Sequence, residues 1–213
     1  MSSFGNREGA RIVTDLIRAI QENKQYLSDI DGAIGDGDHG VNMAKGFGLC
    51  AEELDKNPGD LSHGLEVLGK TLMMRIGGAM GPLYGSLFRS MSKAIGDQES
   101  IDAQSFGRML EAASQAIRNL SDAKIGDKSL VDTLYPAAER YAEDLAGGAD
   151  FVNALDSMAE AGRAGRDSTR DLVAKIGRSS RLGERSRGVV DAGAASCCLI
   201  LETMAGTIKH LIA

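Results

Sequence analysis

Apolar side chains recur at steps of three and four residues along most of the chain, and this spacing predicts amphipathic helices. No run of alternating apolar and polar residues indicates a strand. We expect eight helices, over approximately residues 8–27, 40–54, 65–76, 82–95, 106–120, 127–145, 150–175 and 191–211. Helices joined by short links favour an all-α fold, an antiparallel helical bundle or barrel.

Two residues qualify this pattern of helices. Asp127 is expected to cap the sixth helix, and Pro136 falls inside that helix and should kink it. No change in composition separates two regions, and we find no internal repeat. We therefore expect a single domain over residues 1–213.

The composition is that of an ordinary globular protein, with 43% hydrophobic and only 4% aromatic residues, so aliphatic side chains must form the core. A net charge of −6 without a basic run argues against a nucleic-acid surface. Cys50, Cys197 and Cys198 fit neither a disulfide framework nor a zinc site, which favours buried thiols. The N-terminus lacks the apolar stretch of a signal peptide and residues 192–201 are too short to span a bilayer. We expect a cytoplasmic protein.

The segment from residue 31 to residue 42 carries the clearest chemistry. Asp31, Asp36 and Asp38 stand among glycines just before a predicted helix. Carboxylates that converge need a cation to neutralise them, and oxygen ligands suit Mg²⁺. A solvated turn with a helix cap is the alternative, and this segment alone leaves both open. An EF-hand fails, because position 47 is Phe47 and not the required acid.

Two further glycine-rich segments interrupt the helices, at residues 77–85 and 177–193. The second is rich in arginine, whose planar fork binds phosphate with two donors. Taken with the acidic segment, they favour a combined metal and phosphate site. The fingerprints of P-loop and Rossmann proteins are absent from the sequence.

Together these segments closely resemble the L subunit of dihydroxyacetone kinases, a DAK2-type domain that is also the C-terminal nucleotide domain of single-chain versions. The matching motifs are Asp31…Gly35-Asp36-Gly37-Asp38-His39-Gly40…Asn42, Gly77-Gly78-Ala79…Gly81-Pro82-Leu83-Tyr84-Gly85, Gly126-Asp127-Lys128, Gly177-Arg178…Leu182-Gly183-Glu184-Arg185-Ser186 and Asp191…Gly193. They follow the family order over nearly the whole chain.

The resemblance implies a closed barrel of about eight antiparallel helices, with ADP or ATP and two magnesium ions at one end. It implies that Asp31, Asp36 and Asp38 bind the magnesium. The residues implied in nucleotide binding are His39, Gly40, Val41, Asn42, Ala79, Met80, Ser121, Leu130, Arg178, Asp191, Ala192 and Gly193. Arg178 is also a candidate for stabilising the transition state, and no residue of this chain is assigned as a catalytic base.

Three residues depart from the family pattern. Met80 replaces a usual serine, Ala192 replaces a usual proline, and Arg181 stands where an aromatic residue is common. These changes leave the ketose and the phosphoryl donor open.

The family also implies partners. A separate K subunit binds the ketose, and in bacterial three-subunit systems a phosphoprotein M subunit rephosphorylates the bound ADP. Direct binding of nucleic acid or membrane is not expected. Two alternative functions remain: an ATP-dependent kinase subunit for a four-carbon ketose such as erythrulose, and a nucleotide-sensing module that acts on a transcription regulator.

Overall fold

The computed structural model describes residues 2–213 and confirms the all-α prediction, with nine α-helices in the described part of the chain. The α-helices are α1 (Asn6–Glu22), α2 (Lys24–Ile34), α3 (His39–Lys56), α4 (Leu61–Arg75), α5 (Met80–Ile95), α6 (Ala103–Leu120), α7 (Val131–Ala146), α8 (Phe151–Ser168) and α9 (Ala192–Leu211). The remaining elements are the strands β1 (Ser3–Gly5) and β2 (Ser100–Asp102) and the 3-10 segments η1 (Thr169–Asp171) and η2 (Arg178–Ser186).

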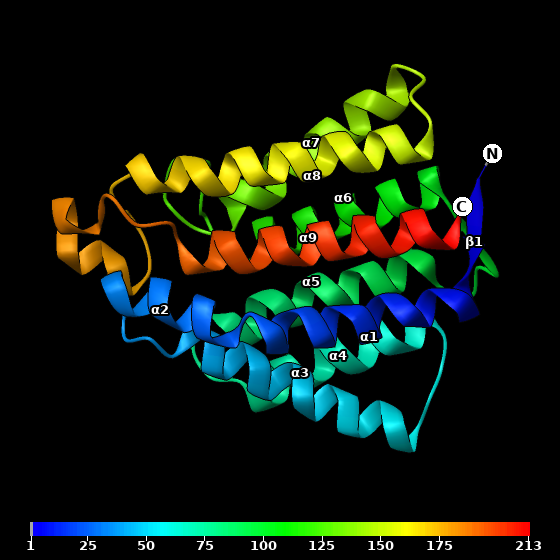
Figure 1. Ribbon diagram of the computed structural model, residues 1–213, viewed down its shortest axis with the longest axis horizontal. Coiled ribbons are helices and arrows are strands. Elements are labelled where there is room, and N and C mark those ends of the chain that lie inside the picture. Colours follow the sequence, from blue (N-terminus) through cyan, green and yellow to red (C-terminus); the bar gives the residue numbers. More distant parts are fainter. Residues whose placement is uncertain (1) are drawn as a thin grey trace.

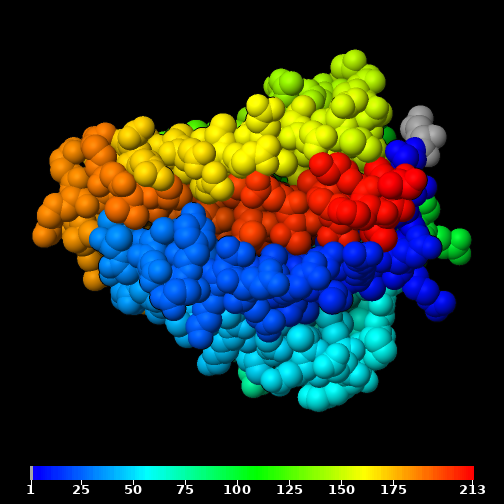
Figure 2. Space-filling view, in the orientation of Figure 1, coloured from blue at the N-terminus to red at the C-terminus, as the bar shows by residue number. Residues whose placement is uncertain are grey.

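Eight of these helices form the expected closed barrel, in which neighbours run antiparallel (Figure 1). The ring passes from α1 through α3, α4, α5, α6, α7 and α8 to α9, and α9 packs against α1 and closes it. Figure 2 shows this closure at the surface, where α9 runs between α8 and α1. The remaining helix, α2, lies at one end, against α3, α9 and η2.

The core consists mainly of aliphatic side chains, as the composition predicts. Leu16, Leu65 and Leu68 are fully buried, and burial of each such side chain contributes ~1.5–3 kcal/mol. Phe47 and Phe88 pack edge to face, with ring centroids 5.9 Å apart. Burial of the three cysteines as free thiols is also confirmed.

A small antiparallel sheet at one end of the barrel was not predicted. Phe4 of β1 faces Ile101 of β2, and both side chains are buried. Three residues are too few for an alternating pattern to indicate a strand. The sheet joins the N-terminal segment to the α5–α6 connection. Since neighbouring helices alternate in direction, four connections lie at the opposite end: α2–α3, α4–α5, α6–α7 and α8–α9 (Figure 1).

The predicted first and seventh helices differ from the structure. Helix α1 ends at Glu22, because the Asn23 side-chain amide donates to the carbonyl of Ala19 at 2.9 Å, and α2 then begins at Lys24. Helix α8 ends at Ser168, where the hydroxyl of Thr169 donates to the carbonyl of Arg166 at 2.6 Å. Short polar side chains that bond the backbone in this way compete with the continuation of a helix.

The predicted cap of the sixth helix was also wrong. Helix α7 begins at Val131, four residues after Asp127. Between them Lys128 has a φ of +66°, which a helix does not allow. The Asp132 carboxylate instead accepts from the N–H groups of Gly126 and Ser129, at 2.5 and 2.7 Å. Pro136 lies inside α7, which continues through it to Ala146.

None of the helices described in residues 2–213 combines the length and the hydrophobicity that crossing a membrane requires.

Candidate metal and nucleotide site

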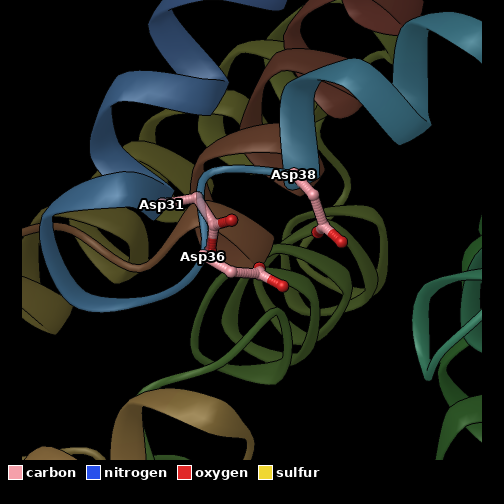
Figure 3. A group of neighbouring side chains, drawn as sticks. All are labelled: Asp31, Asp36 and Asp38. Carbon is pink, nitrogen blue, oxygen red and sulfur yellow. The ribbon is translucent and has the colours of Figure 1, made fainter.

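Three carboxylates converge where α2 passes into α3 (Figure 3). Asp31 belongs to the last turn of α2, whereas Asp36 and Asp38 belong to the connecting loop. Gly37 turns that loop with a φ of +76°, and the backbone N–H of His39 donates to Asp31 Oδ2 at 3.2 Å. One carboxylate oxygen of each residue lies within 4.8 Å of the others. This all-oxygen donor set suits a hard divalent cation such as Mg²⁺.

Arg178 brings a positive charge to the same place. It is the first residue of η2, and its guanidinium forms ion pairs with the Asp36 carboxylate and, at 3.4 Å, with Asp38 Oδ2. All three side chains are about half exposed. The arginine therefore lies at the carboxylate cluster, where it can also reach an anion bound there.

A cavity of about 750 Å³ opens beside the carboxylates and is walled by all four connections at this end of the barrel. Most of the residues predicted from the sequence line it. They are Asp31, Asp36, Asp38, His39, Asn42, Ala79, Met80, Ser121, Leu130, Arg178, Asp191, Ala192 and Gly193.

Two predicted residues do not line the cavity. Gly40 is buried against α2, and a Cβ added there would lie 2.0 Å from the carbonyl oxygen of Lys24. Val41 is 47% exposed on the outer side of α3. The close approach of α2 to α3, rather than contact with a ligand, explains the glycine.

Four helices begin at the cavity: α3, α5, α7 and α9, which follow the four connections that wall it. A helix N-terminus offers free N–H groups and the positive end of the helix dipole, and therefore favours an anion such as phosphate. The first turn of α9 is capped by Asp191, whose carboxylate accepts from the N–H of Ala194 at 2.8 Å. Burial raises the pKa of Asp191 to about 6, partly offset by the Ala194 N–H and by Lys128.

A chain of hydrogen bonds connects the start of α3 to the start of α9. His39 Nε2 lies 2.8 Å from the Ser196 hydroxyl, which lies 2.6 Å from the hydroxyl of Tyr84. Tyr84 donates to the carbonyl of Gly193 at 3.0 Å. Burial lowers the pKa of His39 to about 4, against the effect of Asp31, so the ring is neutral at pH 7. His39 therefore positions the first turn of α9 and adds no charge to the site.

The sequence did not mark three polar residues of the site. Tyr84 and Ser196 belong to the hydrogen-bond chain, and the buried Lys128 lies in the cavity wall, where its ammonium bonds the α8–α9 connection. Tyr84 and Lys128 do occur in the glycine-containing motifs at residues 77–85 and 126–128, which was the only available signal. Ser196 lies in an apolar helix and gives none.

The chain belongs to the DAK2 domain family, which matches residues 33–206. It is 40% identical to the "PEP-dependent dihydroxyacetone kinase 1, ADP-binding subunit DhaL" of Listeria innocua, over 92% of this chain and 94% of that subunit. It is 34% identical to the D-erythrulose kinase of Mycolicibacterium smegmatis, where the match covers 98% of this chain but only 37% of that longer protein. These relatives are phosphotransferases that act on an alcohol group.

The fold is similar to part of the crystal structure of the dihydroxyacetone kinase of C. freundii in complex with AMP-PNP and Mg²⁺. The TM-score is 0.67 at 20% identity, and the match covers 93% of this chain and 33% of that one. This likeness agrees with the helical barrel described above.

Proposed function

We propose that this chain is the ADP-binding subunit of a dihydroxyacetone kinase that takes its phosphoryl group from a phosphoenolpyruvate-fed phosphoprotein. The observation that carries the proposal is the juxtaposition of three carboxylates and four helix N-termini at one cavity. The volume of about 750 Å³ suits a nucleotide. The high identity to a subunit of that name over nearly its whole length supports this assignment.

In this proposal Asp31, Asp36 and Asp38 would hold two Mg²⁺ ions beside the nucleotide phosphates. Bound Mg²⁺ neutralises the charge that phosphates carry as a phosphoryl group moves. The N–H groups at the start of α5 and α9 take phosphate oxygens. Arg178 offers two parallel donors to the terminal phosphate and to the charge that develops on it. At Met80 and Ala192 the backbone, rather than a side chain, makes the contact.

The acceptor ketose belongs to a partner in this proposal. Among the described residues that line the cavity, we assign none as the base that activates a ketose hydroxyl. His39 is already bonded to Ser196. A K subunit therefore supplies the ketose and the base, and an M subunit restores the phosphoryl group on ADP. We place the three proteins in the cytoplasm and treat residues 1–213 as one domain.

The test starts with the purified chain in Mg²⁺ buffer and measures bound nucleotide. We expect retained ADP, no phosphorylation of dihydroxyacetone by the chain alone, and turnover when a K subunit and a phosphohistidine carrier are added. The missing acceptor positioning accounts for the inactivity of the isolated chain, since such positioning lowers a barrier by ~7–11 kcal/mol in favourable cases. Ketose phosphorylation without a K subunit, or the absence of Mg²⁺-dependent nucleotide binding, would contradict the proposal.

The same assay separates the two alternatives. Turnover with ATP and erythrulose in place of the carrier and dihydroxyacetone would favour a subunit of an erythrulose kinase, in keeping with the 34% identity to such an enzyme. Nucleotide binding with no turnover under any pairing, together with capture of a transcription regulator, would favour the sensing module.

A further inference from the structure

A buried ammonium group belongs to a residue in the wall of the cavity. The Nζ atom of Lys128 donates to the carbonyls of Thr169 at 2.6 Å, Leu172 at 3.3 Å and Val189 at 2.5 Å. The residue is only 1% exposed. An ammonium group has three N–H donors, so this cluster of carbonyls satisfies all of them.

The charge of Lys128 is balanced by dipoles rather than by an ion pair. Within residues 2–213 no carboxylate oxygen lies within 4.0 Å of its nitrogen. Burial lowers the pKa of Lys128, and the negative charge of nearby Asp191 partly offsets this effect. Backbone carbonyls gathered around one cation also replace the hydration shell of K⁺ in potassium channels. The Lys128 site thus has the chemistry of a monovalent-cation site whose cation is covalently attached.

The three carbonyls belong to segments that support the cavity. Thr169 and Leu172 follow the end of α8, and Val189 precedes the start of α9. Lys128 is on the α6–α7 connection and lines the cavity together with Ser129 and Leu130. Its backbone has a φ of +66°, a costly conformation for a residue other than glycine. In this conformation the Lys128 side chain is buried.

We propose that the Lys128 ammonium acts as a built-in monovalent cation that holds the α6–α7 and α8–α9 connections together and so positions them for nucleotide binding. We assign Lys128 as a positioning residue, because its ammonium donates to three backbone carbonyls of the α8–α9 connection. This inference rests on the proposed nucleotide site, because positioning is measured through nucleotide affinity.

The experiment replaces the tethered cation by a free one. Lys128→Ala removes the ammonium and leaves space, and affinity for a fluorescent ADP analogue with Mg²⁺ is measured in NaCl, methylammonium chloride and tetramethylammonium chloride at equal ionic strength. In NaCl we expect binding at least ~10-fold weaker than wild type, since three buried or partly buried carbonyls lose the ammonium as a donor. Methylammonium should restore most of the loss, because it carries the same –NH₃⁺ group. Tetramethylammonium has no N–H donor and should not.

Two matched variants complete the design. Lys128→Met fills the space without charge, so it should bind as weakly as Lys128→Ala and methylammonium should not restore it. Lys175→Ala removes a lysine that is paired with Asp127 on the same connections but is 63% exposed, and it should bind like wild type in every salt. A general loss of folding would not produce this pattern, because methylammonium would then act on both Lys128 variants or on neither. Helical content is recorded at the assay temperature for each variant.

Three results would overturn the inference: wild-type affinity in Lys128→Ala, a loss that methylammonium fails to restore, or equal restoration by tetramethylammonium. If Lys128→Ala is unfolded, refolding by methylammonium but not by NaCl tests the same statement, and its failure overturns it. If wild-type protein binds no nucleotide, the proposed function fails instead. The carbonyl cluster is then judged by the melting temperature of Lys128→Ala, which methylammonium should raise more than that of wild type.

Discussion

Replacing Asp36 by Asn removes one charge from the carboxylate cluster with almost no change in side-chain size. The three carboxylate oxygens lie within 4.8 Å of one another. Two unit charges at that distance interact by about 2–3.5 kcal/mol at an effective dielectric constant of 20–40, and a divalent cation among them gains at least as much from each carboxylate. Because the Asp36 side chain is 47% exposed, the lower end of this range applies. We expect Asp36→Asn to weaken metal binding by ~2–3 kcal/mol, a factor of about 30–150.

The free energy of unfolding should not follow the metal affinity. In metal-free protein the substitution relieves repulsion from Asp31 and Asp38 and gives up an exposed pair with Arg178, and exposed ion pairs contribute only ~0–1 kcal/mol. The unfolding free energy should therefore stay within ~1 kcal/mol of wild type. Substitution of a structural residue would lower both the unfolding free energy and the metal affinity. Substitution of a metal ligand lowers only the metal affinity.

Titration with Mn²⁺, followed by electron paramagnetic resonance, measures the metal affinity directly, and urea denaturation measures the stability. Asp29→Asn is the matched control, because Asp29 is an exposed acid of α2 whose carboxylate, within residues 2–213, accepts a hydrogen bond from Gln25 alone. It should bind Mn²⁺ like wild type. The reasoning is refuted if Asp36→Asn stays within about threefold of wild type, or if the Asp29 variant loses as much.

Four further predictions concern single residues around the site and the barrel. Arg178→Gln should bind Mn²⁺ severalfold more tightly without nucleotide, since the guanidinium no longer competes for two of the carboxylates, yet bind the metal–nucleotide complex more weakly; equal Mn²⁺ affinity would refute the competition. Gly165→Ala should lower the urea unfolding free energy by ~1–3 kcal/mol, because its Cβ would lie 2.0 Å from the carbonyl oxygen of Asp132. Gly206→Ala, whose Cβ meets nothing within 4 Å, should raise it by ~0.5–1 kcal/mol. Relative to Asp191→Asn, wild type should be most stable below pH 3.8 and should lose up to ~3 kcal/mol as pH rises from 3.8 to about 6, because burial raises the pKa of Asp191 in the folded state. A pH-independent difference in unfolding free energy between the two proteins would contradict this sign.

The sequence predicted the helices of the barrel because each carries an apolar face at helical spacing, and burial of that face decides where the helix lies. It did not predict the end of α1, where one asparagine side chain competes with the backbone. The separation of α1 from α2 matters for the site, because it makes Asp31 part of the last turn of a helix rather than of a loop. The direction of its carboxylate is thus fixed by α2.

The cavity residues also divide into those that the sequence predicted correctly and those that it did not. His39 and Asn42 are three positions apart on α3 and therefore share a face, which is the one that lines the cavity. Gly40 and Val41 lie between them in sequence and so point elsewhere, a distinction that a contiguous motif does not make. Lys128 was not assigned a role because it lies in a loop, where no periodic pattern indicates which side chains are buried. Its surroundings depend on three carbonyls that are distant in sequence and come together only in the fold.

The carboxylates and the helix N-termini make opposite demands at one cavity. The N-termini of α3, α5, α7 and α9 favour an anion, whereas Asp31, Asp36 and Asp38 repel one. A cation bound between the carboxylates and a phosphate would reconcile the two, because it would attract both. Each ligand then raises the affinity of the site for the other, and thermodynamic linkage requires the two increases to be equal. The antiparallel barrel makes this coupling possible, since the alternation of its helices brings the acidic connection and four helix N-termini to the same end.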